Sequence, residues 1–245
     1  MLERWIDGQG KNGNSVAVEM GKVLLKNFGD ISSEQPESKL SDLDKAVSEY
    51  KNDPSNPEKL TQFMSAFWQE AGQRIGKSYT VEAFPLTSKE LKERKERGEM
   101  AISVPQGISR VDLGKMFPKM GSWSVEEGNS AKDIKDNFDC LWIESAVDAP
   151  NLNTTEAMLD EIAREKGKDG QSLRSYIIGA QISKVLVGKY FDEGATSSRL
   201  PGSRDGGRVL SASFDSGGSL SVGSYCFPGA HNGLLGGRFE EVVKA

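Results

Sequence analysis

The chain has 245 residues, enough for one large domain or two small ones, and its net charge of −5 argues against nucleic acid as the main ligand, which needs a basic face. No apolar stretch approaches the roughly 20 residues that span a bilayer, so no membrane span is expected. The polar start carries no secretory signal and two cysteines do not make a disulfide framework, so we expect synthesis in a reducing cytoplasm, with later display on a cell surface or virion left open.

Residues 1–76 are predicted to form an N-terminal helical segment. An amphipathic helix is expected over 15–28 and a short helix over 41–51. Pro57 favours the start of a further helix over 58–76, because proline is well tolerated in the first helical turn. The apolar stripe of that helix consists of Leu60, Phe63, Met64, Phe67 and Ala71.

Residues 77–245 are predicted to form a second domain that contains both strands and helices. Residues 79–84 (YTVEAF) alternate between polar and apolar side chains, which favours a strand. The further strand candidates are 100–105, 123–125 and 140–144. The helix candidates are 88–98, 110–117, 153–167 and 171–190, of which the last is the longest and has a broad apolar face.

The tail of the chain, from Gly194 to Arg238, has an unusual composition. It contains no Lys, Glu, Gln, Met or Trp. Because these types make up roughly a quarter of an ordinary chain, a gap of this length is not expected by chance. Glycine, serine, Asp, Asn, His, Tyr, Cys and small apolar residues take their place.

A period-two pattern divides part of this tail into two faces. One face carries Leu210, Ala212, Phe214, Leu220 and Val222, and the other carries Ser211, Ser213, Asp215, Ser219, Ser221 and Gly223. The glycines of 215–218 favour a turn between the two strands. An irregular loop over 224–233 and a final strand over 238–243 follow. A glycine- and serine-rich sheet without any binding role would show the same alternation.

The tail resembles the variable region of target proteins of diversity-generating retroelements, which end in a C-type-lectin-like domain of the formylglycine-generating-enzyme type. In that family, adenines of a template repeat are mutagenised, and Asn codons come to encode a residue set without Lys, Glu, Gln, Met or Trp. RLPGSRDGGRVL (199–210) is similar to the Arg-Leu-Pro turn of that fold, and LGGRFEEVV (235–243) is similar to its Gly-Phe-Arg ending, with the order altered to Gly-Arg-Phe. Its Gly-Asn-Val-Trp-Glu-Trp and Arg-Gly-Gly-Ser-Trp motifs are absent.

The resemblance implies an α+β fold, with a C-type-lectin-like domain of two helices and a small antiparallel sheet at 77–245 after the helical segment. It implies a protein that binds an unknown protein or surface ligand through a hypervariable surface within about 196–238. The expected ligand contacts are Ser211, Ser213, Asp215, Ser219, Ser221, Gly223, Ser224, Tyr225, Cys226, Phe227, His231 and Asn232, with Tyr225 and Phe227 as aromatic anchors. The residues expected to hold the scaffold are Gly206, Gly207, Arg208, Gly236, Gly237, Arg238 and Phe239.

Enzymatic activity, a metal and a cofactor are not expected. His231 is the only histidine, so a zinc site built on several histidines is excluded, and a Ser-His-Asp triad would lack a nucleophile elbow. Cys140 and Cys226 could match the catalytic cysteine pair of formylglycine-generating enzymes, but their spacing gives no support and Cys226 lies where that family varies, so a free, buried Cys140 is expected. Residues 8–15 lack the lysine of a phosphate loop, and the Glu-Pro-Asn and Trp-Asn-Asp sugar motifs are absent. The alternatives are an enzyme of the formylglycine-generating-enzyme-like fold and a passive virion or envelope structural protein.

Overall fold

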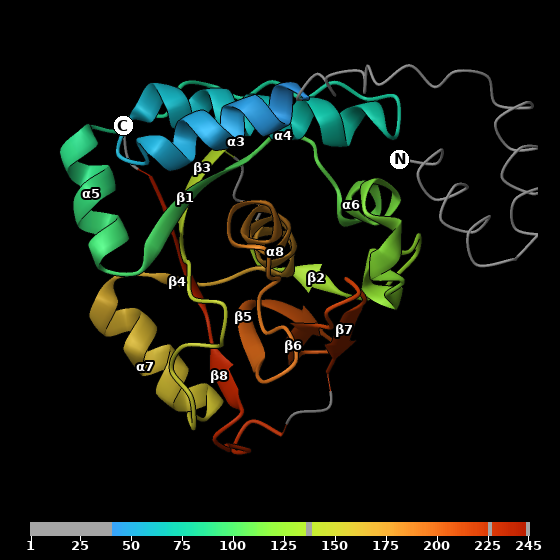
Figure 1. Cartoon of the computed structure of the whole chain (residues 1–245). Coiled ribbons are helices and arrows are strands. Elements are labelled where there is room, and N and C mark those ends of the chain that lie inside the picture. Colours follow the sequence, from blue (N-terminus) through green and yellow to red (C-terminus); the bar gives the residue numbers. More distant parts are fainter. Residues whose placement is uncertain (1–40, 136–138, 225–226, 244–245) are drawn as a thin grey trace, which may run out of the picture. The chain divides into compact units, whose positions relative to one another are not determined.

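The computed structural model of the chain describes residues 41–135, 139–224 and 227–243 (Figure 1). The helix expected over 15–28 lies outside these residues. Within them, no helix combines the length and the apolar composition that crossing a bilayer requires.

The helices α3 and α4 begin at side-chain caps. Ser41 forms a capping box with Asp44 ahead of α3, and Asn56 accepts two backbone N–H groups ahead of α4. The two helices span Asp42–Asn52 and Pro57–Gln73, close to the predicted ranges. The predicted apolar stripe of α4 is buried.

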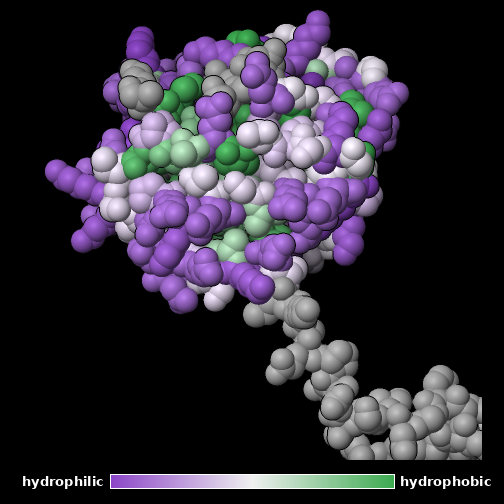
Figure 2. Space-filling model, turned by 90° about the horizontal axis from the view of Figure 1, so that it is seen from above, coloured by the Kyte–Doolittle hydropathy of each residue, from purple (hydrophilic) through white to green (hydrophobic). Residues whose placement is uncertain are grey.

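Seen from above, the molecule presents a mostly hydrophilic surface with small hydrophobic areas between the polar side chains (Figure 2).

These helices belong to the same compact unit as the remainder of the described chain. Trp68 Nε1 in α4 donates a hydrogen bond to Ser103 O at 3.1 Å, and the Phe67 and Phe117 rings stack with centroids 6.1 Å apart. Residues Ser41–Ala245 form one compact unit, and α3 and α4 are packed into it together with the residues after residue 76, where the sequence predicted a domain boundary. The physical reason is that the apolar stripe of α4 is covered by residues that follow it in the sequence.

One antiparallel sheet joins the beginning of the fold to its end. Its strand order is β1-β3-β9-β4, and Ile143 of β3 lies opposite Met100 of β1 and Glu240 of β9. These strands confirm the predictions at 100–105, 140–144 and 238–243. The strands are β1 (Glu99–Val104), β3 (Asp139–Glu144), β4 (Asp169–Gly170) and β9 (Phe239–Val242).

A second sheet contains most of the tail. Its order is β2-β5-β6-β7, all antiparallel, and β8 pairs with β5 in parallel. The register between β5 and β6 shifts between Leu200 and Arg204, so the Arg-Leu-Pro segment expected as a turn lies within a long, irregular strand. The strands are β2 (Lys132–Asp133), β5 (Ser197–Asp205), β6 (Arg208–Phe214), β7 (Leu220–Gly223) and β8 (Leu235–Gly237).

Helix α8 connects the two sheets, because it contacts both β1 and β5 (Figure 1). Gly179 permits the close packing, since a Cβ at this position would lie 2.4 Å from Ile143 Cδ1. The architecture is therefore α+β, with two largely antiparallel sheets. The helices are α5 (Ser88–Glu96), α6 (Arg110–Met116), α7 (Glu156–Lys166) and α8 (Leu173–Val187), with 3₁₀ turns η1 (Pro118–Met120) and η2 (Trp123–Val125).

Two strand predictions are wrong. Residues 79–84 have no regular secondary structure, and the N–H of Phe84 donates to the Thr61 hydroxyl at 3.3 Å instead of to a strand. Residues 123–125 form the 3₁₀ turn η2, and Trp123 Nε1 donates to Val222 O at 3.0 Å. In both segments the apolar side chains are fixed by tertiary contacts, which a local alternation of side chains does not distinguish from strand pairing.

Candidate binding face on the β6–β7 hairpin

The β6–β7 hairpin confirms the predicted division between its two faces. Leu210, Ala212, Phe214 and Leu220 are buried, whereas Val222 is half-buried. On the other side, Ser213 lies opposite Ser221, and Ser211 lies opposite Gly223. We call the outward residues Ser211, Ser213, Asp215, Ser219, Ser221 and Gly223 the hairpin face.

The predicted turn at 215–218 is held by Asp215. Its carboxylate accepts the Ser219 N–H at 2.9 Å, and its backbone carbonyl accepts the Gly218 N–H at 3.1 Å. The backbone hydrogen bond from Ser219 is the main cause that lowers the pKa of Asp215. Gly218 has φ +94°, and a Cβ there would lie 2.8 Å from the Tyr190 hydroxyl oxygen, so glycine is required. Asp215 is therefore part of the turn as well as of the exposed face.

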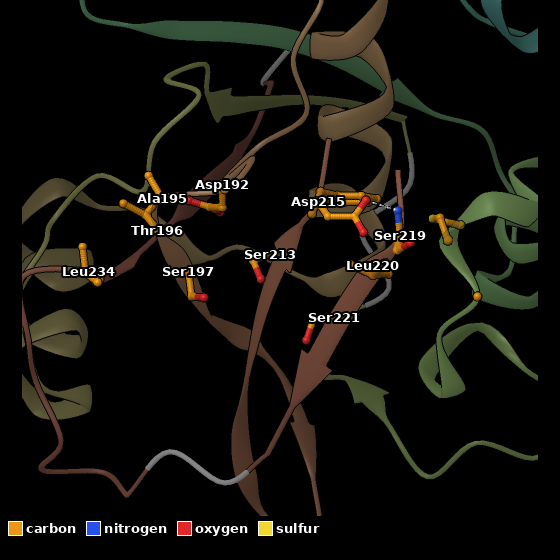
Figure 3. A pocket seen from close by; sticks show the side chains of 14 residues that line it. Asp192, Ala195, Thr196, Ser197, Ser213, Asp215, Ser219, Leu220, Ser221 and Leu234 are labelled. Carbon is orange, nitrogen blue, oxygen red and sulfur yellow. Dashed lines mark hydrogen bonds between the residues drawn. The ribbon is translucent and has the colours of Figure 1, made fainter. Parts of the chain in front are cut away.

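A hollow of about 680 Å³, lined by both polar and apolar side chains, lies over this face. Ser213 and Ser221 line it from β6 and β7, and Ser197 lines it from β5 (Figure 3). Because Ser198 lies opposite Ala212, Ser197 lies beside Ser213, and the three hydroxyls form a row across three adjacent strands. Leu234 closes the hollow on the side of the loop (Figure 3). Small hydroxyl side chains leave the row open to a ligand that approaches from solvent.

Arg199 supports the loop beside this hollow from below. Its side chain is only 1% exposed, and its guanidinium donates to Thr154 O at 2.6 Å, Phe227 O at 3.2 Å and Ala230 O at 2.6 Å. The segment before α7 supports the loop too, because the Glu156 N–H donates to Pro228 O at 2.9 Å. The path of the loop is thus fixed largely through its backbone carbonyls.

Arg238 is a second buried arginine, and it joins separate segments of the chain near the end of the tail. The side chain is fully buried, and Nε donates to Ser198 Oγ at 2.8 Å while Nη2 donates to Val147 O at 3.0 Å. Nη2 also lies 3.4 Å from Asp192 Oδ1 in a fully buried ion pair. Through these contacts Arg238, which directly precedes β9, is joined to Ser198 in β5, to Val147 and to Asp192, and Asp192 lines the hollow.

The remaining scaffold predictions hold in part. Gly236 and Gly237 are buried where a Cβ would meet Pro150 O at 2.1 Å and the Leu159 side chain at 2.5 Å. Gly206 and Gly207 form a turn with positive φ. Arg208, in contrast, is exposed at the start of β6. A charged side chain at a strand end has free access to solvent, unlike the two buried arginines.

We expected all of the predicted contact residues to be exposed to solvent, but several of them are half-buried. Exposed positions are Asp215, Ser219, Ser221, Phe227, His231 and Asn232, whereas Ser211, Ser213, Gly223 and Ser224 are half-buried. Ser211 Oγ donates to Gly223 O at 3.3 Å, and Ser224 Oγ donates to Asp205 at 3.1 Å, which accounts for the lower exposure of both hydroxyls. Tyr225 and Cys226 lie outside the described residues.

The loop brings large apolar side chains to the surface as well. Phe227 is 78% exposed and Leu234 is 64% exposed. His231 is exposed with Nδ1 3.1 Å from Gly229 O, and Asn232 Oδ1 accepts the Leu234 N–H at 2.8 Å. Sequence reasoning missed Ser197 and Leu234 as lining residues, although both lie within the stretch without Lys, Glu, Gln, Met or Trp.

The described residues contain no group of three or more His, Cys, Asp or Glu side chains that could hold a metal ion. Cys140 is half-buried in β3, so the prediction that it is buried is wrong in degree. Comparison with known proteins gives no family model, no curated protein and no solved structure that matches the chain.

Proposed function

We propose that this protein binds a protein or another surface ligand through the hairpin face and the adjacent loop, and that the side chains of this surface are diversified by a retroelement. A C-type-lectin-like arrangement of the domain is part of the proposal. The resemblance in composition and in the Arg-Leu-Pro and Gly-Arg-Phe segments supports both.

One observation carries the proposal: much of the backbone of the proposed contact surface is held by strand pairing and by Arg199, and these contacts do not involve the side chains of Ser213, Ser221 or Phe227. Arg199 bonds the carbonyl oxygens of Phe227 and Ala230, and every residue type supplies such a carbonyl. Ser213 and Ser221 point outward from paired strands whose inward neighbours form the core. A substitution at Ser213, Ser221 or Phe227 therefore leaves these supporting bonds in place.

The composition of the surface suits a binding role. Ser, Gly and Asn give adaptable hydrogen bonding, and an aromatic residue gives a large rigid contact, which are the properties that antibody binding loops use. Phe227 is the exposed aromatic that the described residues offer at the loop. A partner that covers this ring would gain apolar burial at the centre of a polar contact surface.

A pair of matched libraries tests the proposal. The first randomises Ser213, Ser219, Ser221, Phe227 and His231, and the second randomises the inward residues Leu210, Ala212, Phe214 and Leu220. We expect most members of the first library to stay folded, with melting temperatures within a few degrees of the parent, and selection to yield binders to unrelated proteins. Most members of the second should unfold, because changes to a packed core cost several kcal/mol.

Equal loss of folding in both libraries would refute the division of the tail into scaffold and contact residues. A folded first library that never yields binders would favour the passive structural alternative. The retroelement component has its own test, because the neighbouring DNA should contain a reverse transcriptase gene and a near-copy repeat that differs from the tail-coding sequence at adenines.

A further inference from the structure

A second hollow lies between α3, α5, α8 and the outer strand β1, and it shares no residue with the hollow over the hairpin face. Its volume is about 280 Å³. The apolar part of its lining includes Leu91, Met100, Trp142, Leu186 and Val187. A space of this size, bounded by an indole and aliphatic side chains, suits a small molecule with a single ring.

Ser183 supplies an unused hydrogen-bonding group inside this hollow. The residue is only 2% exposed, and its hydroxyl has no hydrogen-bond partner among the described residues. Buried hydroxyl groups in folded proteins normally have a partner, because leaving one unsatisfied costs free energy. Ser183 is among the residues that line the hollow, so a bound molecule that reaches its buried hydroxyl can supply the partner.

Two lysines lie at the entrance of the same hollow. Lys51 at the end of α3 and Lys95 near the end of α5 are exposed, and within the described residues neither forms an ion pair. The one carboxylate in the lining, Glu99, is already neutralised by Arg94 and Lys168. Burial raises the pKa of Glu99, but hydrogen bonds and charges from Lys168 and Arg94 outweigh burial and lower it. The entrance therefore has an excess of positive charge.

We propose that this hollow binds a small aromatic carboxylate that carries a hydroxyl or carbonyl group at the end opposite the carboxylate. The ring contacts Trp142 and the aliphatic side chains. The distal polar group bonds the Ser183 hydroxyl, and the carboxylate remains at the entrance, where Lys51 and Lys95 neutralise it. This site is independent of the hairpin face and of its proposed function.

Calorimetric titration of the full chain with three probes tests the site. 4-Hydroxyphenylacetate has all three features, phenylacetate lacks the distal hydroxyl, and tyramine keeps the hydroxyl but reverses the charge. We expect 4-hydroxyphenylacetate to bind about fivefold more tightly than phenylacetate, the size of effect that one hydrogen bond supplies. Tyramine should show no saturable binding.

Variants separate the two polar contributions. Ser183→Ala should make the two acids bind equally, and the double change Lys51→Ala with Lys95→Ala should weaken both acids alike. Ser213→Ala, on the hairpin face, is the matched control and should leave all three titrations unchanged. Melting temperatures check that each variant is folded, and a serine-to-alanine change in a helix interior favours the helix.

Three results would overturn the proposal. The first is no saturable binding of either acid at millimolar concentration to the folded parent. The second is equal binding of tyramine and the acids, and the third is a hydroxyl preference that survives in Ser183→Ala. In the first case, an ordered water on Ser183 in a crystal structure would assign the hollow to solvent.

Discussion

Replacing Phe239 by alanine tests whether the end of the tail is scaffold. The side chain is completely buried, and the Lys166 ammonium lies 5.6 Å from the ring centroid. The backbone of Phe239 pairs with Gly170, and its N–H donates to Glu144 Oε2 at 3.0 Å. These backbone contacts remain in the alanine variant, so the loss consists of ring burial and the cavity left behind. Such a change costs about 3–5 kcal/mol of unfolding free energy.

Ser221→Asn is the matched control, because Ser221 is exposed on the hairpin face opposite Ser213. Its cost should stay within about 0.5 kcal/mol, as for most surface substitutions. Urea denaturation of the parent and both variants gives the free energies, provided that the slope of each transition is unchanged. If the two substitutions cost the same, residues in this tail are not divided into scaffold and contact positions, and the proposed function loses its structural basis.

Three further predictions address the loop and the charged groups. Phe227→Ala should leave the melting temperature unchanged but weaken binding of a selected ligand by about 2 kcal/mol or more, as calorimetry can measure. Arg199→Lys should lower the unfolding free energy by about 1.5–3 kcal/mol and accelerate hydrogen exchange at the Ala230 amide, because one ammonium cannot bond three separated carbonyls. Glu99 has a lowered pKa in the folded state, so its stabilisation is present above its unfolded pKa of about 4.3 and is lost as the pH falls through the folded pKa. Glu99→Gln should therefore flatten the fall in unfolding free energy below that pH, and a fall as steep as in the parent would contradict the ion-pair argument.

Patterns within one element allowed correct predictions. The stripe of α4 and the alternation of Leu210, Ala212 and Phe214 are local periodicities, and the structure buries both sets. The glycine-rich turn between β6 and β7 was also predictable, because Gly218 needs a positive φ. In each case the signal and the structure that it specifies involve the same few consecutive residues.

Contacts between distant segments were not predictable from local patterns. The parallel pairing of β5 with β8 joins Ser197 to Leu235, and nothing near either residue specifies its partner. Ser197 was not among the predicted site residues for the same reason, because its position beside Ser213 depends on the register between β5 and β6. Arginine is usually exposed, so the burial of Arg199 under the loop could not be inferred from its residue type.

The supporting bonds also indicate which contact positions are free to change. Ser221 and Phe227 are exposed, and their side chains are not needed to hold the hairpin or the loop. Asp215 and Asn232 are exposed too, but Asp215 closes the turn through Ser219 and Asn232 bonds the next segment of the loop. Exposure alone therefore does not define a replaceable position: the side chain must also be absent from the local hydrogen bonds that fix the backbone. In the first library, clones selected for binding should tolerate many residues at Ser221, whereas an added randomisation of Asp215 should retain mainly Asp, Asn or Ser, the side chains that can accept the Ser219 N–H.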